Sequence, residues 1–479
     1  MPLNLVSLRR FGTPSLPYYM KPLSVLISLL RVSLFGVALA SLCASAQEAK
    51  IIKIVGDASA VSVTGATGVV TPGMTLPVNA RLITGAGVEV YVEAMTGVVA
   101  TVKPNSEVTV SSLGSASNRT LDLRRGSVVT QVDPSKYKKD SYGVKTPRGV
   151  AAARGTVYAV TVNGQAYSIV TVDGVVSVTP VGGGAGSTIT IEAGGISISS
   201  VNGGAPSTAA QIANDPAANT AVIQAASMAV AALAVVAADP TSFGGASGVA
   251  AGQLSQVMAT IVKQIPQALS QAVASGSAAA PAQAAAIVAA AVSAAGPANV
   301  AQVAQTVAQA AAQGAASTTS DASSAAALAQ AIAKSAAAAA AGASPSEAAS
   351  LANAISQAAA FGAVQGAIQS GQSANTVGAA IANGAAQGAA QGAASAAPAQ
   401  AANIAGASAN GAAQGAAKGG STNLDAASIS NAAAAGATSG SGSPVSPPAP
   451  PKVGAPASVP PPTTPVTPID PTITVSPSN

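Results

Sequence analysis

The composition of the chain changes abruptly near Pro206, and this change constrains the fold more than any other feature of the sequence. From Pro206 to about Gly440 alanine is the commonest residue, and glycine or proline interrupts it repeatedly. Alanine has the highest helix propensity, but it contributes little apolar area to a core. We therefore expect an alanine-rich helical, low-complexity region over 206–440, loosely associated or partly disordered, with disorder increasing toward the C-terminus.

Recurring signals within this region predict successive helices. Helix starts are expected roughly every 25 residues, near Pro297, Asp321, Pro345, Ala374 and Pro398. The segment NGAAQGAAQGAAS from Asn383 recurs as NGAAQGAAKGG from Asn410. This pattern indicates duplicated helices rather than a strict solenoid. Glycine at every fourth position permits close helix approach, although each interior glycine costs about 1 kcal/mol relative to alanine.

Residues 441–479 are rich in proline and form the last predicted region. Such a segment favours extended polyproline conformation over helix or central strand. We expect a disordered spacer or tether here, with a recognition ligand as the alternative.

The N-terminus has the pattern of a signal peptide. The apolar run Val32–Leu42 follows Arg31 and precedes Ala44-Ser45-Ala46, a small-residue pattern that signal peptidases cleave after. We expect residues 1–46 to be removed, with Met20 as a possible true start. The run is shorter than the roughly 20 residues that span a bilayer, so a retained anchor is the alternative. All four basic residues of this segment leave with it, and the mature chain is then nearly neutral.

Residues 47–205 are expected to form an all-β domain, a β-sandwich or β-roll of short antiparallel strands. Val88, Val90 and Val92 alternate with more polar residues, as in half-buried strands. Asn-Gly and Asp-Gly pairs between apolar runs predict tight turns. The expected C-terminal strands are a meander and a further hairpin, over Thr156–Val162, Ala166–Val172, Val175–Pro180, Thr188–Ile191 and Ile196–Ser199.

The residue types that are absent exclude much of catalytic chemistry. The sequence has no histidine and no tryptophan, and its single cysteine is Cys43, within the predicted signal peptide. Histidine-dependent triads, thiolate nucleophiles and His or Cys zinc sites are therefore excluded. The glycines at 182–184 precede no lysine, so no phosphate-binding loop is indicated. We expect a non-enzymatic protein without a cofactor or a metal site.

The most specific stretch is VKTPRGVAAARGTVYAV, residues 144–160, followed by Asp173-Gly174. With its Thr-Pro, Gly-Thr and Asp-Gly pairs it resembles the FecR-type periplasmic domain, over about Ile51–Gly195. The resemblance implies an envelope β module; the best-known members are transmembrane regulators with a cytoplasmic anti-sigma segment. Because little sequence precedes the apolar run, we expect only the β module to carry over. The matching residues are expected to be structural: Thr146, Pro147, Gly155, Thr156, Asp173 and Gly174.

Two of these pairs have specific expected roles. Gly155-Thr156 is expected to begin a strand, and Pro147 to keep an edge strand from pairing.

Basic residues gather around the same stretch. They are Arg124, Arg125, Lys136, Lys138, Lys139, Arg148 and Arg154. They indicate either a cationic surface for lipopolysaccharide, cell-wall polymer or a protein partner, or a solvated face. Neither half of the mature chain has the concentrated basic face of a nucleic-acid-binding protein.

The sequence as a whole predicts an exported envelope protein of Gram-negative type, periplasmic, secreted or at the cell surface. Its β domain is expected to serve as a binding or scaffolding module for a protein or an envelope polymer, with no membrane-spanning helix in the mature chain. Two alternatives remain open. One is a structural or surface protein that self-associates through its alanine-rich helices; the other is a FecR-like signal transducer whose apolar run stays uncleaved as an anchor.

Overall fold

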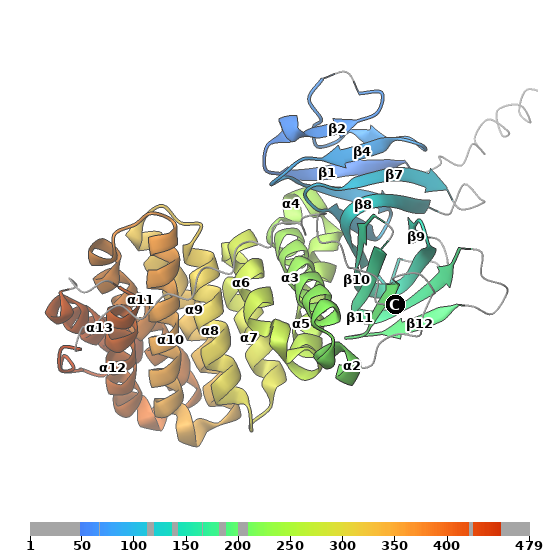
Figure 1. Ribbon diagram of the computed structural model, residues 1–479. Helices are drawn as coiled ribbons and strands as arrows, with labels where there is room; N and C mark the ends of the chain where they lie inside the picture. The colour runs from blue at the N-terminus through green and yellow to red at the C-terminus, as the bar shows by residue number, and fades with distance from the viewer. Residues whose placement is uncertain are drawn as a thin grey trace, which may run out of the picture. The chain divides into compact units, whose positions relative to one another are not determined.

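The computed structural model describes residues 48–66, 68–112, 119–136, 142–164, 166–181, 188–199, 209–420 and 425–451 (Figure 1). The predicted signal peptide, Lys138, Lys139 and the tail beyond residue 451 lie outside these residues. From Glu48 onward the chain belongs to one structural unit. A strand-rich part comes first and a helical part follows it, as predicted.

The strands of the described residues join into a single sheet. Its main path runs in the order β12-β11-β10-β9-β8-β6-β5-β1-β3, with β2, β4, β7 and β13 attached beside it. Neighbours pair antiparallel, except that β8 and β9 are parallel. The strands are β1 Ala49–Val55, β2 Val61–Val63, β3 Thr75–Leu76, β4 Arg81–Thr84, β5 Glu89–Met95, β6 Val98–Val102, β7 Glu107–Ser112, β8 Arg119–Val132, β9 Tyr142–Thr146, β10 Gly149–Asn163, β11 Ala166–Pro180, β12 Ile189–Glu192 and β13 Ile196–Ser199.

The sheet closes on itself in a barrel-like manner around β8. This strand pairs with β7 through its first half and with β6 and β10 through its second half. The inner face holds an apolar cluster that includes Leu82, Val90, Leu121, Tyr158 and Ile169, each fully buried or nearly so. The predicted all-β domain with a Val, Ile and Leu core is confirmed at this level.

The predicted C-terminal meander is wrong in one respect. Ala166–Val172 and Val175–Pro180 are not two strands joined by a turn, because β11 continues through Asp173-Gly174. The pair forms a bulge instead. The predicted hairpin is also different: β12 pairs with the second half of β11 and β13 with its first half, rather than with each other.

The outer face of the same sheet is buried as well. Tyr91, Val99, Val129, Val157 and Val170 point away from the inner core, and they share one apolar cluster with the helices. Helices α3 and α5 cover this face (Figure 1). The near-continuous apolar runs of β6 and β10 follow from this arrangement, since strands buried on both faces lose the polar alternation of a half-buried strand.

The helical part consists of helices joined by short turns, several of which open with proline at a 3₁₀ turn such as Pro345–Glu347. The helices are α2 Ala209–Asn214, α3 Pro216–Ala238, α4 Pro240–Phe243, α5 Gly245–Gln264, α6 Leu269–Ala279, α7 Ala284–Ala295, α8 Val300–Ala316, α9 Ala322–Ala343, α10 Ala348–Gln369, α11 Ala374–Ala396, α12 Ala401–Gly419 and α13 Ala426–Ser441. The five predicted helix starts are confirmed to within three residues of α8 to α12.

These helices stack in two rows. From α7 onward each helix packs on the helix two before it, and α6 packs on α3. One row is α3, α6, α8, α10 and α12; the other is α5, α7, α9, α11 and α13 (Figure 1). The expectation of loose association is therefore wrong for the described helices. Their alanine faces are buried, as in α9, where Ala329, Ala333, Ala336 and Ala340 have no exposed surface.

Glycine rows make this packing possible. On α11, Gly384, Gly388 and Gly392 lie against backbone carbonyls of α9, and a methyl group at Gly388 would overlap the carbonyl oxygen of Gln330. The same relationship joins α10 to α8, α12 to α10 and α13 to α11. Close backbone approach lets small alanine side chains fill the interface, which compensates for their small area.

Among the described helices, α3 is long and apolar enough to cross a membrane. It is mostly buried within the structure, between the outer face of the sheet and helices α5 and α6. A central helix covered on several sides is apolar all round for that reason. The stretch 444–451 after α13 has no regular secondary structure, as its prolines predict.

Candidate functional site

The Gly-Thr and Asp-Gly pairs lie opposite each other in a paired bulge of β10 and β11. The register between the two strands shifts between Arg154 and Val157, opposite Asp173. Both strands exchange partners here: along the chain, β10 passes from β9 to β8, and β11 passes from β13 to β12. The bulge is thus where the sheet turns to close, which is a common role of bulges in barrels.

Glycine is required at both positions of this bulge. Gly155 has a φ of 61° and Gly174 a φ of 79°, in the left-handed region that other residues avoid. A Cβ on Gly155 would lie 2.7 Å from Cβ of Pro134, and one on Gly174 would lie 2.5 Å from Cγ2 of Thr156. The expectation that Gly155-Thr156 begins a strand is wrong, because both residues lie inside β10.

Asp173 and Thr156 are the polar side chains of the bulge. The pKa of Asp173 is raised by burial, which the backbone hydrogen bond from Gly174 partly opposes. The hydroxyl of Thr156 is fully buried and has no hydrogen-bond partner in the structure. Their place inside the paired bulge supports a structural role.

Thr146 and Pro147 form the tight turn between β9 and β10. The Thr146 hydroxyl accepts hydrogen bonds from the backbone N–H of Gly149 at 3.1 Å and of Arg148 at 3.3 Å. Pro147 is exposed in this turn. The expectation that Pro147 protects an edge strand is wrong, since β9 is paired on both sides, with β8 and β10.

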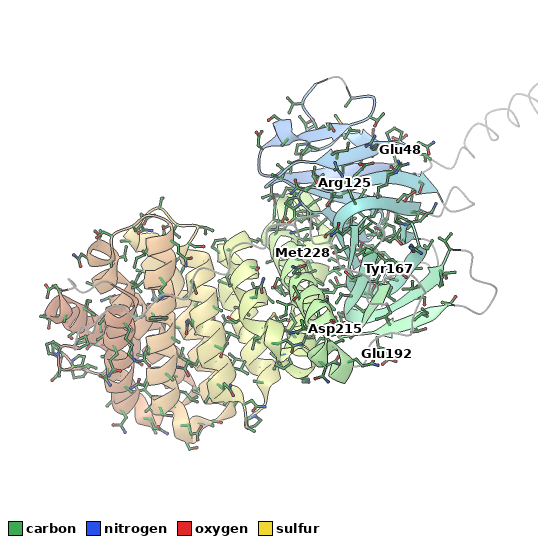
Figure 2. All side chains as sticks on the ribbon, in the orientation of Figure 1. Glu48, Arg125, Tyr167, Glu192, Asp215 and Met228 are labelled. Atoms are coloured by element: carbon green, nitrogen blue, oxygen red, sulfur yellow. The ribbon has the colours of Figure 1, made fainter. Side chains whose placement is uncertain are left out.

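The predicted basic residues whose side chains are described lie at three places in the strand-rich part: in β8, in the turn after β8 and in the β9–β10 turn. Arg124 and Arg125 are exposed near the middle of β8. Arg125 (Figure 2) forms an ion pair of 3.5 Å with Glu107. Lys136 follows the C-terminal end of β8. The part of β8 after Arg125 spans roughly 20 Å, at about 3.3 Å per residue, and separates Arg125 from Lys136. Arg148 is half-buried in the β9–β10 turn. The side chain of Arg154 lies outside what the structure describes, as do Lys138 and Lys139.

Four side chains join the sheet to α4. Lys53 of β1 donates to the carboxylate of Asp239 at 2.6 Å, and this carboxylate also accepts from the Ser242 backbone N–H at the start of α4. The pKa of Asp239 is lowered, first by the Lys53 hydrogen bond and then by those of Thr241 and Ser242. The rings of Tyr91 and Phe243 meet edge to face, with centroids 5.5 Å apart.

Two glutamine amides complete this junction. Gln253 of α5 donates to the Val132 carbonyl at 2.9 Å, and Gln131 of β8 donates to the Ala246 carbonyl at 3.4 Å. Each amide thus joins one part of the chain to the backbone of the other. Both side chains are almost fully buried.

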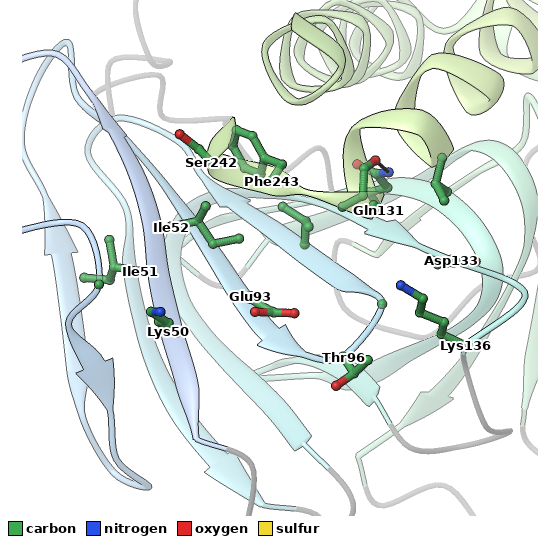
Figure 3. A pocket seen from close by; sticks show the side chains of 16 residues that line it. Lys50, Ile51, Ile52, Glu93, Thr96, Gln131, Asp133, Lys136, Ser242 and Phe243 are labelled. Atoms are coloured by element: carbon green, nitrogen blue, oxygen red, sulfur yellow. Dashed lines mark hydrogen bonds between the residues drawn. The ribbon is translucent and has the colours of Figure 1, made fainter. Parts of the chain in front are cut away.

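A pocket of about 270 Å³ opens beside these contacts, between the sheet and helices α4 and α5 (Figure 3). We call it the junction pocket. It is lined by Lys50, Ile51, Ile52, Gly73, Glu93, Thr96, Gly97, Val99, Gln131, Asp133, Lys136, Ser242, Phe243, Gly245, Ala246 and Val249. Acidic, basic and amide side chains therefore meet an apolar wall in one cavity, which is typical of small-molecule sites.

Two tight turns position the polar side of the junction pocket. Gly97, in the turn between β5 and β6, accepts at its carbonyl from the Asp133 backbone N–H at 2.7 Å. The buried Asp133 carboxylate accepts from the backbone N–H and hydroxyl of Ser135, at 2.9 and 2.7 Å. These bonds hold the 133–136 turn against the β5–β6 turn and place Lys136 at the pocket.

Sequence reasoning did not find the junction pocket, because its members come from distant segments whose contact no local pattern reveals. The described residues contain no group of three or more His, Cys, Asp or Glu that could hold a metal ion. One signal in the sequence is the near-continuous apolar run of β6, Val98–Val102. It indicates that both faces of this strand are covered, and hence that the sheet packs against another part of the chain.

Comparison with known proteins identifies one family in the chain. Residues 80–177 match the model of the family described as FecR protein. The match begins just before β4 and ends within β11, so it includes the Thr-Pro turn and the paired bulge. No curated protein matches the sequence. The chain therefore contains a FecR domain, and the helical part lies outside the matched residues.

Proposed function

We propose, from the FecR domain at 80–177, that this chain is an exported, non-enzymatic envelope protein that binds or scaffolds other envelope components. The observation that carries the proposal is the shared apolar core. Outer-face side chains such as Tyr91, Val99 and Val170 belong to the same buried cluster as α3, α5 and the later helices. The helical rows are thus a continuation of the domain rather than a loose appendage.

This arrangement suits a scaffold. Packed helical rows offer a long surface of fixed geometry, as solenoid proteins do for their partners. The charged residues of the helices are few, so polar recognition on this surface would depend on amide and hydroxyl groups. A protein or an envelope polymer rich in hydrogen-bonding groups fits such a surface better than nucleic acid does.

The test is to express the full chain in a Gram-negative host, fractionate the cells and sequence the mature N-terminus. We expect a mature start at Gln47 in the periplasm or medium. The purified mature chain is then co-sedimented with cell-wall sacculi and with lipopolysaccharide vesicles, and captured partners are mapped by cross-linking. A chain that keeps residues 1–46, or that captures neither polymer nor protein, contradicts the proposal.

A second candidate function is periplasmic signal transduction, which the FecR match supports. It requires the apolar run before Ala46 to remain as a membrane anchor. The same fractionation separates the two functions, since a transducer stays in the inner membrane with its N-terminus intact.

A further inference from the structure

Gln131 borders the junction pocket, and its Nε2 donates to the Ala246 carbonyl. Its Oε1 has no hydrogen-bond partner and less than 1 Å² of accessible surface. This oxygen is therefore enclosed by protein, and a molecule in the pocket would bind to other groups.

Two opposite charges face the same cavity without pairing. Glu93 extends its carboxylate into the junction pocket, and Lys136 points its ammonium toward it from the 133–136 turn (Figure 3). Lys50 lies directly opposite Glu93 on the neighbouring strand. Among the described residues, none of these three side chains forms an ion pair. Charges elsewhere in the sheet, such as Lys103 with Glu89, do pair.

The remaining wall is apolar. Phe243 and Val249 come from the helical side, and Ile52 and Val99 come from the sheet. The cavity of about 270 Å³ is of the size of a small metabolite. The pocket therefore presents a carboxylate, two cations and an apolar surface around one cavity.

We propose that the junction pocket binds an α-amino acid with an apolar side chain. Its ammonium donates to Glu93, its carboxylate accepts from Lys136, and its side chain packs against Phe243 and Val249. No covalent step is involved. The inference deepens the proposed function by giving a binding protein a small ligand, and it rests on that function only for its biological setting.

The first test is calorimetric titration of the purified mature chain with L-alanine, L-valine, L-leucine, L-methionine and L-phenylalanine. At least one is expected to bind with a Kd below about 1 mM. Acetylation of its amino group or amidation of its carboxylate is expected to weaken binding at least about 10-fold, because each removes a charge-assisted hydrogen bond. Glycine is expected to bind about 10-fold more weakly, since it lacks the apolar side chain. If none of the five binds below about 1 mM, the inference is overturned.

Variants test which group of the ligand each of the two charged side chains, Glu93 and Lys136, binds. Glu93→Gln is expected to weaken binding of the amino acid and of its amide alike. Lys136→Met is expected to weaken binding of the amino acid but not of the amide, which has no carboxylate to lose. Glu192→Gln and Lys418→Met alter exposed residues that do not line the pocket, and they serve as matched controls that should bind as the wild type does. Equal affinity of Glu93→Gln and wild type would overturn the assignment.

A dipeptide tests whether the zwitterionic ligand is a free amino acid or a short peptide. Glycyl-leucine carries the same charges farther apart, so the pocket should prefer the free amino acid. A preference for the dipeptide would overturn the amino acid as ligand. Failure of the proposed function, seen by fractionation and co-sedimentation, leaves these titrations unaffected, because they use purified protein and defined ligands.

Discussion

The side-chain amide of Gln253 on α5 donates a 2.9 Å hydrogen bond to the backbone carbonyl of Val132 at the end of β8. The bond crosses from the helical part to the FecR domain and is buried. Together with the Lys53–Asp239 pair and the Tyr91–Phe243 contact, it makes the junction a continuous part of the fold. The outer face of the sheet is consequently an interior surface.

Removing the helical part should therefore damage the sheet. A chain that ends at residue 205 exposes apolar side chains such as Tyr91, Val99 and Val157, each of which loses about 1.5–3 kcal/mol of burial. We expect it to bind a hydrophobic dye strongly and to unfold at lower urea concentration than the full chain. A control that ends at Ser370 keeps the junction and should retain near-native protection of β5 and β6 in hydrogen exchange. Equal stability of the short fragment and the full chain would show that the outer face needs no cover.

The glycine rows predict opposite effects for two similar substitutions. Gly388→Ala places a methyl group on the Gln330 carbonyl and should lower the free energy of unfolding by about 1–3 kcal/mol. Gly406→Ala, within α12, meets nothing within 4 Å and should raise it by up to about 1 kcal/mol through helix propensity. Urea unfolding followed by circular dichroism measures both. If Gly388→Ala also stabilises, α11 does not approach α9 as closely as described.

Acid should weaken the junction through Asp239. Because the folded-state pKa of Asp239 lies below its ordinary value of 3.8, the carboxylate stabilises the fold above pH 3.8, and this contribution is lost as the pH falls toward the folded pKa. At pH 7 the cycle of Lys53→Met and Asp239→Ala should give a coupling energy of about 0.2–1 kcal/mol, the range of partly exposed pairs. At pH 2 the coupling should be smaller.

Asp321 provides the matched control for this cycle. It caps α9 and its pKa is lowered to about 2 by hydrogen bonds from Ser323 and Ser324, but it does not contact Lys53. Asp321→Ala and Lys53→Met should therefore be additive at both pH values. Additivity of the Asp239 cycle at pH 7 would argue against the ion pair.

Alkaline pH should weaken the fold through Tyr91. Burial raises the pKa of Tyr91 well above 10, with the nearby Glu89 as a further cause. Stability from this residue is full below pH 10 and falls as the pH rises toward the folded pKa, by up to about 1.4 kcal/mol per pH unit. Tyr91→Phe should remove this loss, and Tyr167→Phe should not. Urea titrations at pH 8 and pH 10.5 measure the difference, and identical pH profiles of Tyr91→Phe and wild type would contradict the assignment.

Local signals made the broad organisation predictable from sequence. Asp321 accepts from the Ser324 backbone N–H at 2.8 Å, as a helix cap does, and Pro345 opens the turn that leads into α10. The alternation of apolar and polar residues around Val90 likewise predicts a strand. Each of these signals depends on neighbours in the sequence, so each can be recognised without the fold.

Features that depend on distant segments were not predictable. Gly174 has a positive φ, which suits both a hairpin turn and a bulge, and only the opposing Gly155 decides between them. Whether the alanine helices pack depends on glycines meeting carbonyls of another helix, as Gly388 meets Gln330. The junction pocket likewise needs Glu93 and Lys136 to be brought together by two turns that share one hydrogen bond.

From α7 onward each helix packs on the helix two before it, which has a consequence for how such a protein can vary in size. The contact of glycines with backbone carbonyls repeats from α10 on α8 to α13 on α11. We therefore expect that one helix from each row can be inserted or deleted together in this part without altering the sheet. Each such step changes the reach of the molecule by about one interhelical distance, 8–10 Å. The number of helices thus sets the length of the helical rows.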